Sequence, residues 1–354
     1  MEVRFRQFEY KTDYHSQRAL FEECFPETTV MPAGNANHYS WKHGLNKNSH
    51  EFSALIGSNL IGYYAAINFT YTYNNVTNVT SGLVCDVMTG HKARGQGVFA
   101  GLGIYSTEQL SARGCDFTTG FPIRDEVIPG HKKAGWEVSF PLPLYAKLNG
   151  ADSILNKFKV GFLAPIIKFL IKFLSVPFDF VTPSRSLVVS AIGLNDLVDD
   201  SDYPVLVDSM SDRHRIYLSK TKEFMKWRLG APESEYRIVK SSVDGILSGY
   251  IVAKEIDKFG VRCLAILDLV NIAGGTKATK MLVKELIRTS RPSDLVLFMC
   301  NKNLYKNYKL YLCGFFRSPF KFTFIFKNLS CRVKTTELDH ERNWHLTWLD
   351  SDDL

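Results

Sequence analysis

The sequence lacks several features that would indicate an extracellular or a metal-stabilised protein. Its seven cysteines are scattered along the chain, and no two of them are separated by only two residues. Neither a disulfide framework nor a structural zinc site is therefore expected. The N-terminal residues do not show the pattern of a signal peptide. We expect a cytoplasmic protein.

Long apolar runs and basic runs are also scarce. Residues 160–181 are strongly apolar, but Pro165 and Pro177 interrupt them and Lys168 and Lys172 lie four residues apart. A membrane-spanning helix needs about 20 apolar residues in a row. We interpret 160–181 as an amphipathic linker helix, with weak association with a membrane surface as the alternative. Although the net charge of +7 favours anionic ligands, no basic run predicts nucleic-acid binding.

The most informative segment joins an apolar strand to a helix. Residues 85–99 read Cys-Asp-Val-Met-Thr-Gly-His-Lys-Ala-Arg-Gly-Gln-Gly-Val-Phe. The first amides of a helix have no partner within the helix, and the helix dipole is positive there. Gly95 and Gly97 allow a ligand to approach the backbone, and Lys92 and Arg94 add full charges. The segment predicts a site for a phosphate-bearing ligand.

Two common phosphate loops fit this segment poorly. The nucleoside-triphosphate loop has four residues between its glycines, followed by Lys-Ser or Lys-Thr, and neither feature is present. The dinucleotide fingerprint is Gly-x-Gly-x-x-Gly with an acidic residue about 20 positions later. Here Gly95, Gly97 and Gly101 leave one residue too many, and Asp116 precedes the next apolar run instead of ending it.

A third loop fits better. Lys-Ala-Arg-Gly-Gln-Gly-Val-Phe at 92–99 resembles the pyrophosphate loop of the GNAT superfamily of acyl-CoA N-acyltransferases, whose pattern is Gln/Arg-x-x-Gly-x-Gly/Ala. Lys92 replaces the first residue of that pattern. Downstream, Lys-Lys-Ala-Gly-Trp at 132–136 resembles the family's later Tyr-x-x-x-Gly-Phe turn. The resemblance implies acetyl-CoA or another short-chain acyl-CoA as cosubstrate, and no metal.

The resemblance also implies which residues hold the acyl-CoA. In the family, the strand before the loop binds pantetheine through its backbone and offers an amide to the thioester carbonyl, and the loop amides hold the pyrophosphate. The residues expected to bind acyl-CoA are Cys85, Val87, Met88, Lys92, Arg94, Gly95, Gln96, Gly97, Val98 and Phe99.

Candidates for proton transfer are fewer. His131 lies four residues before Gly135, where the family often has a tyrosine as general acid, and imidazole titrates near neutrality. Asp86 in the strand, and Asp125 and Glu126 after the next strand, supply carboxylates that could act as a base or hold the acceptor ammonium. An ordinary surface or packing role is open for each of them.

Acceptor-binding residues are expected before the first hairpin and beside the acidic pair. Residues 37–43, Asn-His-Tyr-Ser-Trp-Lys-His, are rich in groups that stack and donate hydrogen bonds. The candidates for substrate binding are His38, Tyr39, Trp41 and Arg124.

The chain repeats its plan at an offset of about 180 residues. Turn-and-strand, Asp-apolar, glycine-loop and Gly-aromatic features recur in order. We therefore predict an α/β fold of two tandem GNAT-like domains, each a mixed, mostly antiparallel sheet flanked by helices. The expected limits are 1–150 for the first domain, 151–185 for the linker, and 186–354 for a degenerate second domain with a C-terminal strand tail.

The second loop, Asn-Ile-Ala-Gly-Gly-Thr-Lys at 271–277, lacks the Arg-Gly-Gln-Gly core, so one acyl-CoA is expected per chain. The two-domain plan, the Gly-Phe-Pro at 120–122 and the tail 344–352 resemble bacterial nucleotide-sugar N-acyltransferases. That resemblance implies a dTDP-amino sugar as acceptor and a role in polysaccharide biosynthesis. The alternatives are a peptide or aminoglycoside-like amine as acceptor, or a non-catalytic acyl-CoA sensor.

Overall fold

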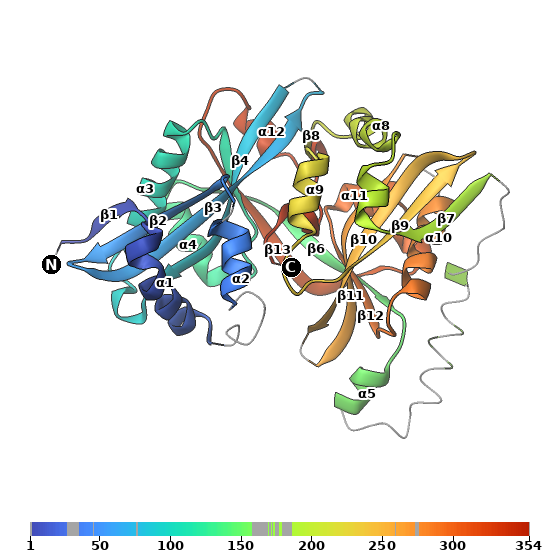
Figure 1. Ribbon diagram of the computed structural model, residues 1–354, viewed down its shortest axis with the longest axis horizontal. Helices are drawn as coiled ribbons and strands as arrows, with labels where there is room; N and C mark the ends of the chain where they lie inside the picture. Colours follow the sequence, from blue (N-terminus) through green and yellow to red (C-terminus); the bar gives the residue numbers. More distant parts are fainter. Residues whose placement is uncertain are drawn as a thin grey trace. The chain divides into compact units, whose positions relative to one another are not determined.

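The computed structural model describes residues 2–26, 35–44, 46–75, 77–157, 169, 171, 173, 177–178, 186–258, 260–272 and 276–353 (Figure 1). Most of the predicted linker helix 160–181 lies outside these residues. Two compact units are present, and each is described by itself. Unit 1 comprises Met1–Phe140, Ala231–Glu233 and Thr323–His340, and unit 2 comprises Pro141–Gly230, Ser234–Phe322 and Glu341–Leu354.

The sheet of unit 1 has the strand order β1-β2-β3-β4-β5-β13. All neighbours are antiparallel except β4 and β5, which are parallel. The strands are β1 (Arg4–Gln7), β2 (Ser49–Ile56), β3 (Asn59–Tyr73), β4 (Thr77–Thr89), β5 (Phe117–Gly120) and the second part of β13 (Phe316–Asn328).

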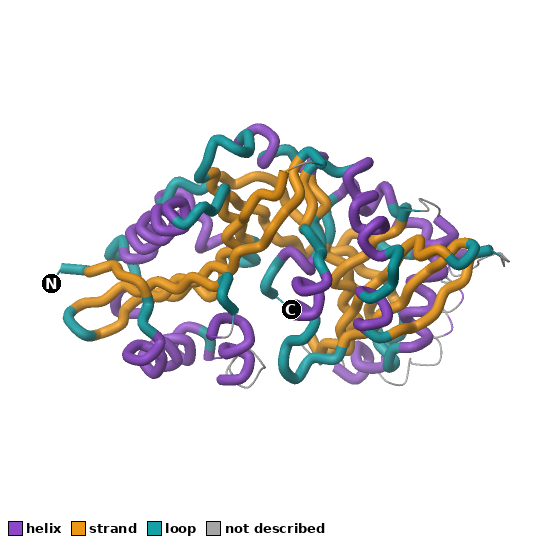
Figure 2. Tube along the Cα trace, turned by 45° about the horizontal axis from the view of Figure 1, so that its top comes forward, coloured by secondary structure: helices purple, strands orange, loops and turns teal. Residues whose placement is uncertain are grey.

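Helices cover both faces of this sheet (Figure 2). Helix α3 follows β4 and leads to β5, and its apolar side chains pack on one face with Phe52, Tyr64 and Val84. Helix α1 packs on the other face, where Asp13 accepts a hydrogen bond from Ser53. The helices and helical turns of unit 1 are α1 (Tyr10–Cys24), α2 (Ala36–Tyr39), η3 (Ser40–Gly44), η4 (His91–Ala93), α3 (Val98–Ala112), η5 (Asp125–Val127), α4 (Ile128–Lys133) and α12 (Thr335–Leu338).

Unit 2 repeats the sheet of unit 1 strand for strand. Its order is β7-β9-β10-β11-β12-β6, again with one parallel pair, β11 and β12, and with helix α10 (Thr276–Thr289) between those two strands. The strands are β7 (Leu187–Ile192), β9 (Tyr236–Val243), β10 (Ile246–Lys258), β11 (Val261–Asn271), β12 (Leu295–Met299) and the second part of β6 (Glu137–Leu148). The prediction of two similarly built, mostly antiparallel α/β domains is confirmed.

The closing strand of each sheet comes from the other half of the sequence. Strand β6 starts in unit 1, and residues 144–148 pair with β12 of unit 2. Strand β13 starts in unit 2, and residues 325–328 pair with β5 of unit 1. This exchange of strands was not expected from the sequence. The expected domain limits at residues 150 and 185 remain predictions.

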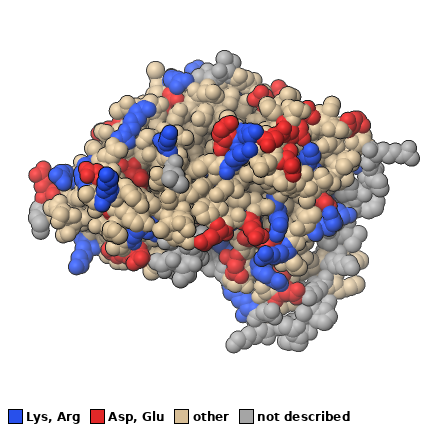
Figure 3. All heavy atoms as spheres, in the orientation of Figure 1, with Lys and Arg blue, Asp and Glu red and all other residues tan. Residues whose placement is uncertain are grey.

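Unit 2 contains further short helices and strands. None of the helices that the structure describes is long and apolar enough to cross a membrane. Basic and acidic side chains are interspersed on the face shown in Figure 3. The remaining elements are α5 (Asp152–Lys157), α7 (Leu194–Val198), α8 (Tyr203–Asp208), η7 (Ser209–Asp212), β8 (Ile216–Leu218), α9 (Lys222–Arg228), α11 (Lys302–Asn307), η8 (Leu310–Cys313), η9 (Glu341–Asn343), β14 (Trp344–His345) and η10 (Trp348–Asp350).

Candidate active site

Strand β4 parts from β5 shortly before the glycine loop. The parallel pairing joins residues 81–83 to 117–119 and goes no further. On the β3 side the register shifts, because Tyr63 pairs with Met88 while Ala65 pairs with Cys85. Strand β4 therefore holds one extra residue, which is a β-bulge. Asp86 lies in this bulge with φ +49°, a left-handed conformation. Among the described strands, the last part of β4 thus pairs only with β3.

The loop after β4 has the geometry of an anion site. Gly95 and Gly97 have φ of +77° and +80°, and a Cβ at either position would meet no atom within 4 Å. Glycine is therefore needed for the backbone conformation, and the space beside it is open. Gly97 is the N-cap of α3, so the amides that follow it have no acceptor within the helix. The expected strand, loop and helix are all present.

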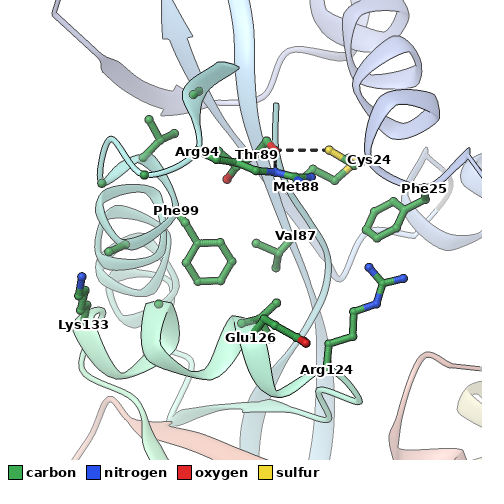
Figure 4. A pocket seen from close by; sticks show the side chains of 17 residues that line it. Cys24, Phe25, Val87, Met88, Thr89, Arg94, Phe99, Arg124, Glu126 and Lys133 are labelled. Atoms are coloured by element: carbon green, nitrogen blue, oxygen red, sulfur yellow. Dashed lines mark hydrogen bonds between the residues drawn. The ribbon is translucent and has the colours of Figure 1, made fainter. Parts of the chain in front are cut away.

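A cavity of about 740 Å³ lies in unit 1 (Figure 4). It is bounded by the glycine loop, by α4 and by the free part of β4, which is the part after residue 83 that no longer pairs with β5. Val87 and Phe99 point into it from β4 and α3, Glu126 approaches from η5, and Arg124 approaches from the residue just before η5. Among the lining side chains that the structure describes, three are cationic and one is acidic, and this balance favours an anion. The lining residues are Cys24, Phe25, Val87, Met88, Thr89, Ala93, Arg94, Gly95, Gly97, Val98, Phe99, Ala100, Arg124, Glu126, Val127, Gly130 and Lys133.

Seven of the ten residues expected to bind acyl-CoA line this cavity. The other three are Cys85, which is buried in β4, and Lys92 and Gln96, which are exposed on the loop. The Gln96 side-chain amide donates to the Lys92 carbonyl at 2.8 Å, which closes the loop on itself. Ligand roles for these three residues remain predictions.

Some lining residues come from the end of α1 and from α4 and were not among the residues expected from the sequence. The Cys24 thiol and the Arg94 guanidinium both reach the Thr89 carbonyl, at 3.6 and 3.3 Å. Burial raises the pKa of the Cys24 thiol, against the opposing effect of Arg94. No motif links α1 to the loop, so only the fold brings Cys24 and Phe25 here. Lys133, by contrast, lies within the Lys-Lys-Ala-Gly-Trp motif that the sequence analysis had singled out.

His131 does not line the cavity. It is buried in α4, and its ring makes edge contacts with Phe99 and Trp136 at centroid distances of 5.0 and 5.1 Å. Burial lowers the pKa of His131 to about 4, so the imidazole is neutral at pH 7. This position supports a packing role, and the geometry gives the predicted acid role no support. Of the two acidic candidates after β5, Glu126 lines the cavity while Asp125 is exposed outside its lining.

Asp86 is engaged in a polar cluster. Its Oδ2 lies 3.0 Å from the Lys42 ammonium and 2.9 Å from His43 Nε2, and both of those residues are buried. His43 Nδ1 lies 2.7 Å from the Ser49 hydroxyl. Burial acts to raise the pKa of Asp86, but Lys42 and His43 outweigh it and the pKa is lowered. A carboxylate that is ionised and paired in this way is a weak base.

The acceptor-binding candidates before the first hairpin also lie outside the cavity lining. Tyr39 is buried, and its hydroxyl and that of Tyr63 both donate to Glu51 Oε1, at 2.5 and 2.6 Å. Burial and the Glu51 charge raise the pKa of Tyr39. His38 and Trp41 are half-buried, with ring centroids 5.0 Å apart. Their roles in substrate binding remain predictions.

His43, Cys85 and Asp86 bring potential metal-ligand atoms within 4.8 Å of one another. The Lys42 ammonium already lies against the Asp86 carboxylate at 3.0 Å, and a like-charged divalent cation would have to displace it. The cluster therefore fits a metal ion poorly.

The corresponding place in unit 2 is filled by the end of the chain. Strand β11 also parts from β12, after Ile266 and Phe298. Residues 344–351 are all buried, and Thr347 forms a β-bridge with Cys300, which directly follows β12. The Thr347 hydroxyl also donates to Asp268 of β11 at 3.2 Å. The tail thus spans the gap between β11 and β12.

Comparisons with known proteins agree with this architecture. Residues 4–139 match the family model described as acetyltransferase (GNAT) domain. No curated protein matches the chain at a significant level.

Solved structures of similar fold include a GCN5-related N-acetyltransferase from Anabaena variabilis, with 13% identity, a TM-score of 0.64 and coverage of 93% of this chain and 73% of that one. A probable N-acyltransferase from Enterococcus faecalis has 11% identity, a TM-score of 0.65 and the same coverage. A tandem GNAT protein from the clavulanic acid biosynthesis pathway has 13% identity, a TM-score of 0.56 and coverage of 94% and 100%. Residues 4–139 therefore match a GNAT acetyltransferase domain, and the chain as a whole has the fold of a tandem GNAT protein.

Proposed function

We propose that this protein transfers an acyl group from acyl-CoA to an amine, and that the acyl-CoA binds in the cavity of unit 1. The observation that carries the proposal is the cavity itself. It joins the free part of β4 to the unpartnered amides at the start of α3, and Arg94, Arg124 and Lys133 supply positive charge. These are the features that a pyrophosphate followed by an extended thioester arm requires.

The chemistry needs both substrates in line and a neutral amine. The amine nitrogen forms a bond to the thioester carbonyl carbon, and the C–S bond breaks. The proton released from the amine goes to a base, and the CoA thiolate takes up a proton. We assign the contact with the thioester arm to the backbone of Val87 and Met88, and the observation that supports this is that both residues line the cavity.

Glu126 is the carboxylate that we assign to the acceptor amine. It lines the cavity and lies two residues from Arg124, whereas Asp86 is held by Lys42 and His43. A carboxylate that lines the cavity can hold the acceptor ammonium or accept a proton from the amine.

The acceptor that we propose is a nucleotide-linked amino sugar, specifically a dTDP-amino deoxysugar, in the cytoplasm. Support comes from the resemblance of the two-domain plan and tail to nucleotide-sugar N-acyltransferases, and from Arg124, a lining cation available to a second phosphate-bearing substrate. All seven cysteines are free thiols, as a reducing compartment would require.

Release of free CoA thiol, measured with a panel of amines, tests the proposal. Turnover with dTDP-amino sugars above that with peptides and aminoglycosides supports the sugar acceptor. Preference for another amine would overturn that acceptor and keep the acyltransferase. Acyl-CoA binding without turnover on any amine would favour an acyl-CoA sensor.

A further inference from the structure

We propose that Asp86 is a positioning residue of the acyl-transfer site. Its ion pair with Lys42 and its hydrogen bond with His43 hold the β4 bulge in the conformation that turns Val87 and Met88 into the cavity. The inference rests on the proposed function of that cavity.

The bulge needs an anchor because of its backbone conformation. Asp86 has φ +49°, in the left-handed region that residues with a Cβ rarely adopt, although Asp and Asn tolerate it better than most. The next two residues, Val87 and Met88, line the cavity. A change at Asp86 would therefore pass directly along the backbone into the site.

The anchor is built from elements other than β4. Lys42 and His43 belong to η3, and both are buried. His43 is fixed in turn by Ser49 at the start of β2, at 2.7 Å. Charged groups in such a setting make stronger hydrogen bonds than exposed ones. Asp86 is thus tied to the segment that precedes the first hairpin and through it to the hairpin.

Unit 2 supplies an independent argument. There the Lys220 ammonium lies 2.8 and 2.7 Å from the two carboxylate oxygens of Asp268, and both side chains are fully buried. Asp268 also lies at a bulge, because Val252 pairs with Asp268 while Ala253 pairs with Ile266. The tail fills the gap beside this pair, as described above. A Lys–Asp pair therefore accompanies the bulge in both units. In unit 2 the tail occupies the place where a substrate would bind, and the pair is present nonetheless. This favours an anchoring role for the pair over an acid–base role.

Three substitutions separate the two parts of this role. Asp86→Asn keeps tolerance of the left-handed conformation and an oxygen for Lys42 and His43. Asp86→Gly keeps the conformation and loses the anchor, and Asp86→Ala loses both. We expect the acyl-CoA Kd, measured by calorimetry, and the acyl-CoA KM to rise by roughly tenfold or more for Ala, to rise less for Gly, and to stay within about threefold for Asn. The acceptor KM should change little.

A matched control is Asp200→Asn in unit 2, which removes a carboxylate that lies 2.9 Å from Lys240. It should leave the acyl-CoA Kd unchanged. If Asp86→Ala does not fold, Lys42→Met tests the same anchor and should raise the acyl-CoA Kd in the same direction.

The outcomes are distinct. Loss of turnover in Asp86→Asn as complete as in Asp86→Ala, with wild-type affinity in both, would make Asp86 the base and overturn the proposal. A folded Asp86→Ala protein with wild-type Kd and KM would overturn it as well. If the wild-type protein binds no acyl-CoA, the proposed function fails. The anchoring role is then tested by backbone hydrogen exchange over residues 84–90. Exchange should be faster in Asp86→Ala than in Asp86→Asn, and equal rates in the two variants would overturn the proposal.

Discussion

The Thr347 hydroxyl donates to Asp268 Oδ1 at 3.2 Å inside unit 2, so a residue of the C-terminal tail contacts the strand next to the gap between β11 and β12. In unit 1 the equivalent carboxylate is Asp86, and its neighbour Val87 lines a cavity. The two sheets have the same strand order, but they differ at the place where the parallel strands separate, which is between β11 and β12 in unit 2 and between β4 and β5 in unit 1. In unit 2 it is the protein's own chain, and in unit 1 it is open space.

Because the tail fills the gap in unit 2, we predict one acyl-CoA per chain. We also predict that loosening the tail exposes Cys300, which pairs with Thr347. Thr347→Asp places a second carboxylate against Asp268 in a fully buried site and should lower the free energy of unfolding by about 3 kcal/mol. Urea denaturation measures that change, and alkylation of Cys300, followed by mass spectrometry, should become faster. The exposed Cys331 is the internal reference. Thr347→Val should cost only about 1 kcal/mol, and unchanged Cys300 protection in Thr347→Asp would contradict the role of the tail.

Gly97→Trp should weaken acyl-CoA binding strongly. Gly97 has φ +80° at the N-terminus of α3, and an indole there would both strain the backbone and cover the open amides. Gly114 is a matched control, because it has φ +85° at the other end of α3 and equally open space at its Cβ. Calorimetry should show a loss of at least about tenfold in affinity for Gly97→Trp and little change for Gly114→Trp. Equal effects would mean that strain alone acts.

The lining cations should determine the dependence of binding on salt. Arg94→Gln and Lys133→Gln each remove a charge from a cavity in which Glu126 is the one acidic residue among the described lining residues. Each should weaken acyl-CoA binding by roughly tenfold at low salt, and by less as ionic strength rises and screens the charges. Arg288→Gln is the control, because that side chain is exposed and paired with Glu285 in unit 2. A salt dependence unchanged from wild type in both cavity variants would argue against the pyrophosphate site.

His131 makes stability depend on pH. Its pKa is lowered by burial to about 4 in the folded protein, against about 6.5 when unfolded. Between these values the unfolded chain binds more protons, so stability is full above pH 6.5 and falls as the pH drops towards 4. The contribution reaches about 3 kcal/mol at most. His131→Phe keeps an aromatic ring between Phe99 and Trp136 and should flatten this part of the stability curve. If the variant instead loses turnover at pH 7 with its stability intact, His131 is catalytic after all.

Local patterns in the sequence predicted the glycine loop. They did not predict contacts between segments that are far apart in the sequence. Gly95 and Gly97 adopt the conformations expected of a strand-to-helix corner, because that geometry is set by a few neighbouring residues. The exchange of β6 and β13 depends on contacts between segments far apart in the sequence, and no short pattern encodes it. Cys24 and Phe25 reach the cavity only because α1 packs on the sheet, more than 60 residues before the loop. The ion pair of Asp86 is a further example, because its partner Lys42 lies more than 40 residues earlier, in a segment that was expected to bind the acceptor.

Glu126 and Asp125 form the sharpest pair for testing the chemistry, because they are adjacent, both exposed, and differ in whether they line the cavity. Glu126→Gln preserves shape and removes the carboxylate, and it should lower kcat by about 100-fold if that group accepts the proton of the amine. If it only holds the ammonium, the acceptor KM should rise while kcat changes little. Asp125→Asn should leave both constants near wild type. Steady-state kinetics with saturating acyl-CoA distinguishes these outcomes, and an equal loss in both variants would show that the acidic charge of η5, rather than the position of Glu126, is what the reaction uses.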